Sequence, residues 1–140
     1  MKKYTSNRLT ACFRQWRAEG THCRFIHAYK IWFELKFNTN IDLFKRYPEF
    51  ENYLDSWFEG NFNYKTFVAK DDPKLDFFKQ LNDRKVIDLV QLDNVGCERF
   101  SEYVLDKINN ILDNFGLDFK CIQVETWEHE KNSGVVYIEL

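Results

Sequence analysis

The sequence predicts an α+β fold in which a four-stranded antiparallel sheet carries helices on one face. Alternating apolar and polar residues, the period of a half-buried strand, occur near both ends of the chain, over 26–37 and 119–127. Apolar residues at helical spacing lie between them, most clearly over 97–115. Strands at the ends and helices in the middle give the order ββααββ, in which the helices gather on one side of the sheet.

The chain is predicted to be a single domain over residues 1–140. It contains no repeat, low-complexity run or Pro/Gly/Ser linker. A domain of this length buries roughly two-thirds of the surface that its unfolded chain exposes. Aromatic residues make up 18% of the sequence, so we expect the core or a subunit interface to absorb an unusual amount of ring area.

The first two strands are predicted over residues 9–17 and 26–37, joined by a turn at Glu19-Gly20 and paired antiparallel. The second strand alternates polar residues with Ile31, Phe33, Leu35 and Phe37. His27 and Tyr29 share the parity of this apolar set. Both side chains are therefore expected on one half-buried face, with Cys23 in the loop just before it.

Helices are predicted to follow. The first begins at Pro48 and ends at Gly60, and its apolar stripe comprises Phe50, Tyr53, Leu54, Trp57 and Phe58. The second begins at Asp72-Pro73 and buries Phe77, Phe78 and Leu81. Residues 86–92 are predicted to add a short strand. The long helix over 97–115 has Gly116 as its C-terminal stop.

The last two strands are predicted over residues 119–127 and 135–140. Asn132-Ser133-Gly134, a cluster of turn-forming residues, is expected to join them. Together with the first pair, they complete the four-stranded sheet.

Charge and targeting signals exclude some classes of partner. The net charge of −2 and the pI near 5.9 lack the basic footprint of a nucleic-acid-binding domain. No stretch approaches the roughly 20 apolar residues of a membrane span, and the N-terminus has no apolar targeting segment, so we expect a cytoplasmic protein. The four cysteines show no CxxC spacing, which favours reduced thiols.

Three groups of residues resemble a known family. They are Glu19-Gly20 with Cys23 to Tyr29, then Val95-Gly96-Cys97-Glu98, and finally Glu128 with Tyr137. Their order and spacing are similar to those of the 6-pyruvoyltetrahydropterin and 6-carboxytetrahydropterin synthases, whose fold is called the T-fold. The resemblance implies zinc held by three histidines, a proton-transferring cysteine supported by an Asp-His pair, and a glutamate that anchors the pterin ring. It also implies a trimer or hexamer with sites between subunits.

Carried over by position, the resemblance assigns the cysteine to Cys23, the middle zinc ligand to His27 and the ring anchor to Glu128. Tyr29 replaces the third histidine, and Cys12 stands where the first should be. The implied zinc ligands are therefore His27, Cys12 and Tyr29, with His22 as an alternative. Asn63-Tyr64 occupies the place expected for the Asp-His pair.

The chemistry of each residue leaves alternatives open. A catalytic zinc needs three protein ligands and an open position, yet Cys12 lies on the parity opposite to its apolar neighbours and equally fits a small buried thiol. Cys23 acts as acid and base only where a cation or metal lowers its pKa, and is otherwise an inert loop cysteine. His27 without a metal fits a hydrogen-bonded core histidine.

The pair Glu128-His129 is the other candidate. A carboxylate can accept two parallel hydrogen bonds from a pterin or guanine edge. We hypothesise that His129 takes over the proton relay absent at Asn63-Tyr64, because histidine titrates near neutral pH. The alternative is a solvated turn over residues 128–131. Glu98 and Asp71-Asp72 fit helix caps.

These residues predict a zinc-dependent lyase of the 6-carboxytetrahydropterin synthase type. Its substrate would be 7,8-dihydroneopterin triphosphate, from which triphosphate leaves, in queuosine, other deazaguanine or pterin biosynthesis. The alternative is a non-catalytic pterin or purine binder that has lost the zinc triad, which the departures at Cys12, Tyr29 and Asn63-Tyr64 favour. A related enzyme with a different metal set or substrate is the third hypothesis.

Overall fold

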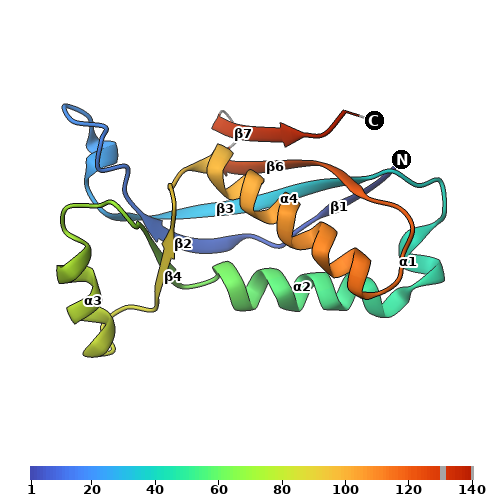
Figure 1. The fold of residues 1–140 in the computed structure, drawn as a ribbon, viewed down its shortest axis with the longest axis horizontal. Coiled ribbons are helices and arrows are strands. Elements are labelled where there is room, and N and C mark those ends of the chain that lie inside the picture. Colours follow the sequence, from blue (N-terminus) through green and yellow to red (C-terminus); the bar gives the residue numbers. More distant parts are fainter. Residues whose placement is uncertain (130–131, 140) are drawn as a thin grey trace.

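The computed structural model describes residues 1–129 and 132–139 (Figure 1). Within this part of the chain, seven strands form one sheet in the order β5-β4-β2-β3-β6-β7, and β1 pairs with β3 beside this path. Their bounds are Lys2–Thr5 (β1), Leu9–Phe13 (β2), His27–Phe37 (β3), Lys65–Ala69 (β4), Leu89–Leu92 (β5), Cys121–His129 (β6) and Asn132–Tyr137 (β7). Strand β3 is the longest, and it pairs antiparallel with β1, β2 and β6.

The α+β class is confirmed, but the prediction of four antiparallel strands is wrong. Strand β4 pairs parallel with both β2 and β5, so the sheet is mixed. Strands β1 and β4 were not predicted, and both are short. In β4, moreover, four consecutive residues are buried, so no period-two pattern marks it.

Several predicted boundaries also shift. Strand β2 ends at Phe13, four residues before the predicted end at Arg17, and β5 begins at Leu89 rather than at Val86. Asn132-Ser133-Gly134 begins β7 instead of forming a turn. The last residue of the predicted strand 135–140 and part of the charged run 128–131 lie outside the described residues.

The helices are α1 (Leu43–Arg46), α2 (Pro48–Phe62), α3 (Leu75–Asp83) and α4 (Cys97–Asn114), with a 3₁₀ turn at His22–Arg24. Helix α2 does not end at Gly60 as predicted but continues to Phe62, whose side chain is buried. Helix α3 begins after Asp72-Pro73 and buries only Phe78, whereas Phe77 is exposed. Among the described residues, none of the helices combines the length and apolar character that crossing a bilayer needs.

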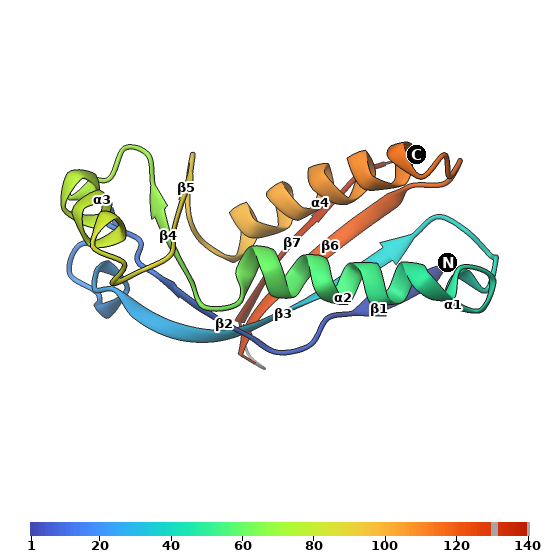
Figure 2. The same ribbon diagram turned by 90° about the horizontal axis from the view of Figure 1, so that it is seen from below.

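Helices α2 and α4 lie along the same face of the sheet (Figure 2). The ring of Phe33 in β3 contacts Phe58 and Phe62 of α2, with centroids 4.9 and 4.7 Å away. Opposite Phe33 in register, Thr126 of β6 bonds Ser101 of α4 at 2.8 Å. The prediction that helices cover one face is therefore correct for these two. Helix α3 instead connects the parallel strands β4 and β5 at one end of the molecule (Figure 1).

Aromatic rings fill the space between the helices and the sheet. Phe100 of α4 packs on Phe67 of β4 at 4.9 Å and meets Phe13 of β2 edge-on at 5.2 Å. All three side chains are at most 3% exposed, and burying a ring of this kind contributes about 1.5–3 kcal/mol. The core thus absorbs much of the aromatic content, and it holds the ends of β2, β4 and α4 together.

Candidate functional site

The loop between β2 and β3 places Cys23 beside the end of β2. The backbone N–H of Gln15 donates to the Cys23 carbonyl at 2.8 Å. Within the loop, the Thr21 hydroxyl accepts from the Cys23 N–H at 3.3 Å and caps the 3₁₀ turn. Arg14 donates to the Arg24 carbonyl at 3.4 Å. Backbone and side-chain bonds therefore tie the thiol-bearing turn to β2.

A cavity of about 240 Å³, here called the site cavity, opens at this point. Its lining residues come from β2, β3, β6, β7, the start of α4 and the loop between β2 and β3: Phe13, Gln15, Cys23, Tyr29, Cys97, Glu128 and Asn132. Three residues predicted from the sequence, Cys23, Tyr29 and Glu128, therefore meet at one cavity within a single chain. The architecture brings a thiol, a phenol and a carboxylate within reach of one small molecule.

The start of α4 and the β6–β7 hairpin approach closely at this cavity. A Cβ atom added to Gly134 in β7 would lie 2.4 Å from the backbone nitrogen of Glu98. The buried Ser101 hydroxyl donates to the Gly134 carbonyl at 2.7 Å. These contacts set the position of Cys97, the first residue of α4, relative to the hairpin that carries Glu128 and Asn132.

Aromatic rings form one wall of the site cavity. The ring of Tyr29 stacks on Phe13, with centroids 4.2 Å apart and planes 20° apart. On β3, the ring of His27 contacts Tyr29 at 4.3 Å, and its Nδ1 lies 2.9 Å from the Phe25 carbonyl oxygen. His27 supports the Tyr29 ring but is not among the residues found lining the cavity.

The residues found in the cavity wall include one carboxylate, Glu128, and no lysine, arginine or histidine. Burial, and after it the nearby Glu128 carboxylate, raises the pKa of the Cys97 thiol to about 12. Burial and then Glu128 likewise raise the pKa of Tyr29 to about 12. Both groups are therefore neutral hydrogen-bond donors at pH 7 and remain so well into the alkaline range, beside the Glu128 carboxylate.

The thiols of Cys97 and Cys121 are expected to lower the free energy of unfolding at alkaline pH. Burial raises the pKa values of Cys97 and Cys121 from 9.0 to about 12, so between these values the folded chain keeps protons that the unfolded chain has released. The stabilisation is complete below pH 9 and falls as the pH rises toward 12. Each thiol contributes a slope of at most about 1.4 kcal/mol per pH unit.

Urea unfolding of the wild type and of Cys97→Ser/Cys121→Ala, repeated from pH 8 to pH 11, measures this effect. We expect the free energy of unfolding of the double variant to fall less steeply with pH. Equal slopes for the two proteins would contradict the assignment. Cys23→Ser, which changes the thiol in the loop between β2 and β3, provides the control.

The three implied zinc ligands do not come together. Cys12 pairs in register with Ala28 and Thr66, while its neighbour Phe13 pairs with His27. Because adjacent residues of a strand point to opposite faces, Cys12 faces away from His27 and Tyr29. Over residues 1–129 and 132–139, no group of three His, Cys, Asp or Glu side chains is placed to hold a metal ion. The donor set therefore does not fit a zinc ion of the three-ligand kind.

Other residues singled out from the sequence lie outside the site cavity. His129 is the last residue of β6 and is not found in the cavity wall. The Asn63 side chain accepts from the Thr10 N–H at 2.9 Å and donates to Glu59 at 2.6 Å, a structural role at the end of α2. Tyr64 is 76% exposed. His22 lies on the exposed 3₁₀ turn, and its ring centroid is 5.9 Å from that of His27.

Two residues of the cavity wall, Cys97 and Asn132, were not predicted as site residues from the sequence. Cys97 stood within the motif Val95-Gly96-Cys97-Glu98, which marked a helix start, but nothing in the pattern showed that the thiol faces Glu128. Asn132 was interpreted as a turn residue. Its distance of four positions from Glu128, across a predicted hairpin, is the signal that could have identified it.

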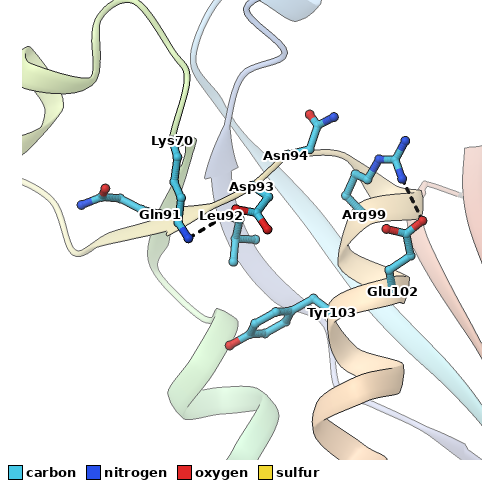
Figure 3. Close-up of a pocket in the computed structure, with 8 residues that line it drawn as sticks. All are labelled: Lys70, Gln91, Leu92, Asp93, Asn94, Arg99, Glu102 and Tyr103. Carbon is cyan, nitrogen blue, oxygen red and sulfur yellow. Dashed lines mark hydrogen bonds and ion pairs between the residues drawn. The ribbon is translucent and has the colours of Figure 1, made fainter.

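Two larger cavities have walls rich in paired charges. One of them, of about 620 Å³, lies between β5 and the first turns of α4, and Figure 3 shows its lining residues. There Lys70 pairs with Asp93 at 3.3 Å and Arg99 with Glu102 at 2.8 Å. The second, about 420 Å³, is lined by Arg14, Arg17 and Arg99, each of which pairs with a carboxylate. The site cavity instead presents a carboxylate with no cation beside it in the wall.

Comparison with known proteins gives a consistent result at the level of the fold. No family model and no curated protein matches the sequence significantly. Solved structures do match. A Wolinella succinogenes protein described as uncharacterized is 14% identical, with a TM-score of 0.72, and the alignment covers 99% of this chain and 96% of that one.

Two further matches are 6-pyruvoyltetrahydropterin synthases. The Caenorhabditis elegans enzyme is 14% identical with a TM-score of 0.60, and the alignment covers 99% of this chain and 94% of that one. A catalytic-residue mutant of the Plasmodium vivax enzyme is 12% identical with a TM-score of 0.57, over 99% and 98% of the two chains. Across its full length, this chain therefore has the T-fold seen in 6-pyruvoyltetrahydropterin synthases.

Proposed function

We propose that the protein binds a pterin or purine ring in the site cavity without a zinc ion held by three protein ligands. The observation that carries the proposal is that Cys23, Tyr29 and Glu128 line one cavity. Among the residues found in its wall, Glu128 is the one carboxylate, and there is no lysine, arginine or histidine. A carboxylate there can accept hydrogen bonds from two adjacent N–H groups of a ring edge. The stacked rings of Phe13 and Tyr29 provide an apolar surface beside it.

The size and polarity of the cavity support a small neutral ligand. Its volume of about 240 Å³ lies below the usual range for sites that enclose drug-sized molecules. Tyr29 and Cys97, both neutral at pH 7, can donate to ring nitrogens or a ring carbonyl. The T-fold of two pterin synthases supports the choice of a pterin over other heterocycles.

Replacing the Glu128 carboxylate tests whether the site cavity binds pterin. We expect pterin to bind the wild type and to bind Glu128→Gln about 10- to 100-fold more weakly, because a hydrogen bond to a charged group contributes about 1.5–3 kcal/mol. Quenching of pterin fluorescence on titration with protein measures both affinities. Glu125→Gln is the matched control, since Glu125 lies on the same strand and bonds Ser133 at 2.7 Å outside the described wall of the cavity. Equal binding by Glu128→Gln, or none by the wild type, would contradict the proposal.

Turnover of 7,8-dihydroneopterin triphosphate is the second candidate function, and the position of Cys23 favours it. The thiol lines the same cavity as Glu128, so it could exchange a proton with a ring substituent. Zinc content separates the two functions: near-stoichiometric zinc retained after dialysis, together with release of triphosphate, would support the lyase. A folded protein that binds pterin without metal supports the binding function.

The expected trimer or hexamer stays a prediction. In the described part of the chain, β5 and β7 are the two ends of the sheet path, and an open sheet edge can pair with another copy.

A further inference from the structure

Two cysteine side chains, Cys23 and Cys97, line the site cavity. They come from separate parts of the fold, since Cys23 lies in the 3₁₀ turn before β3 and Cys97 is the first residue of α4. Gln15 contacts both segments. Its backbone N–H donates to the Cys23 carbonyl at 2.8 Å, and its Nε2 lies 2.7 Å from the position of a Cβ atom added to Gly96, the residue before Cys97.

The other two cysteines do not take part in this arrangement. Cys12 lies on the opposite face of the sheet and is not found in the cavity wall. Cys121 is 0% exposed, and its Sγ lies 3.5 Å from the Gln123 carbonyl oxygen in the core. Among the described residues, Cys23 and Cys97 are therefore the two thiols found together at one cavity.

The two thiol-bearing segments are held to the rest of the protein to different degrees. None of the three side chains of the 3₁₀ turn is buried, and the bonds from the Arg24 N–H to Thr21 and from Arg14 to Arg24 are long, at 3.5 and 3.4 Å. The start of α4 is fixed by the close approach of Gly134 and by the 2.7 Å bond from Ser101. The turn can consequently move toward α4 without opening the core.

We propose that Cys23 and Cys97 form a reversible disulfide across the site cavity, which closes the cavity to its ligand under oxidising conditions. A disulfide brings the two Cα atoms to within about 4.4–6.8 Å of each other, so the turn and the start of α4 close over the space between them. Formation of the bond does not depend on what the cavity binds. Its effect on ligand binding rests on the proposed function.

A small disulfide such as oxidised glutathione supplies the oxidising equivalents. The thiolate of Cys23, on the exposed turn, attacks one glutathione sulfur, and the first glutathione leaves as a thiolate that takes up a proton. Cys97 then loses its proton to solvent and attacks the Cys23 sulfur, which releases the second glutathione. The two protein thiols are oxidised, and one oxidised glutathione is reduced to two glutathione molecules.

The environment of Cys97 sets the rate of the closing step. Burial and then Glu128 raise its pKa to about 12, so its thiolate is scarce at neutral pH. Once formed, a thiolate of high pKa is a strong nucleophile. From the Cys23–glutathione adduct, prepared at pH 6, we expect closure to accelerate about tenfold per pH unit between pH 7 and pH 10. Glu128→Gln removes the neighbouring negative charge and should accelerate closure severalfold at each pH.

Peptide mapping without reduction tests the proposal. Wild type is incubated with oxidised glutathione, its free thiols are blocked with N-ethylmaleimide, and pterin binding is measured before and after. We expect a bond between Cys23 and Cys97 within one chain, loss of pterin binding, and reversal of both by dithiothreitol. Cys97→Ala and Cys97→Ser should each stop at one glutathione on Cys23. Cys12→Ser, which changes a thiol outside the cavity wall, should close like the wild type.

Three results would overturn the inference: glutathione adducts alone in the wild type, a disulfide between chains or to Cys12 or Cys121, or an oxidised protein that still binds pterin. A closing rate independent of pH and of Glu128 would overturn it as well, because Cys97 would then not be the attacking thiol. Failure of the reduced wild type to bind pterin would instead overturn the proposed function, and the peptide map would still show whether the bond forms.

Discussion

Arg14→Met is expected to lower the free energy of unfolding by about 3–5 kcal/mol, the cost of removing one partner of a buried ion pair. Arg14 donates from Nε to Asp72 at 2.8 Å and from Nη2 to the second carboxylate oxygen. The Asp72 side chain is 1% exposed and that of Arg14 is 19% exposed. The substitution would leave a buried carboxylate without its cation, and it would also remove the bond from Arg14 to the Cys23-bearing loop.

Urea unfolding at pH 7 measures this loss, and the double variant Arg14→Met/Asp72→Asn tests its cause. The asparagine keeps an acceptor for the Lys74 N–H, which Asp72 Oδ1 accepts at 2.9 Å, but removes the unpaired charge. We expect the double variant to be more stable than Arg14→Met alone. Arg17→Met is the control, because Arg17 pairs with Asp71 on the surface and surface pairs contribute about 0–1 kcal/mol. A loss in Arg14→Met no larger than in this control would contradict the prediction.

Gly134→Ala is expected to destabilise the protein by about 3 kcal/mol and to weaken ligand binding, because overpacking forces backbone shifts. The new Cβ would lie 2.4 Å from the Glu98 nitrogen, 2.7 Å from its Cα and 2.8 Å from the Cys97 carbonyl carbon. All three are backbone atoms, so the contact cannot be relieved by turning a side chain. Strand β7 or the start of α4 must move, and either movement separates Cys97 from Asn132.

Gly60→Ala provides the opposite control. Gly60 lies inside α2, and a Cβ added there meets no atom within 4 Å. Replacing a helical glycine by alanine stabilises by about 0.5–1 kcal/mol. Thermal unfolding of the two variants, combined with pterin titration, measures both predictions. A Gly134→Ala protein with the stability and pterin affinity of the wild type would show that β7 does not contact α4 as described.

The register of β2 explains why the implied zinc ligands do not come together. Cys12 was the only candidate on the first strand, and its parity already separated it from the apolar face. The structure places it against Ala28 and Thr66, where burial raises its pKa. The donor that the resemblance assigns to β2 therefore lies on the face of the sheet opposite to His27 and Tyr29.

Local patterns in the sequence determined the elements that carry a strong period. The alternation around Phe33 and Phe37 predicted β3, and the spacing from Phe100 to Leu112 predicted α4, which begins at the expected Cys97. Gly116 adopts a positive φ of 70° just beyond that helix, as a C-terminal stop requires. The family motifs likewise pointed to Cys23 and Glu128, which line one cavity.

Only the tertiary structure decided which residues complete the site and how the sheet is connected. Strand β4 is stabilised by pairing with two other strands and carries little local signal, so its parallel pairing could not be inferred from its own residues. Cys97 and Asn132 reach Glu128 because α4 packs against the hairpin at Gly134 and because β6 and β7 shift register beside Glu128. Such contacts join residues distant in sequence, and periodicity describes only the face on which each residue lies.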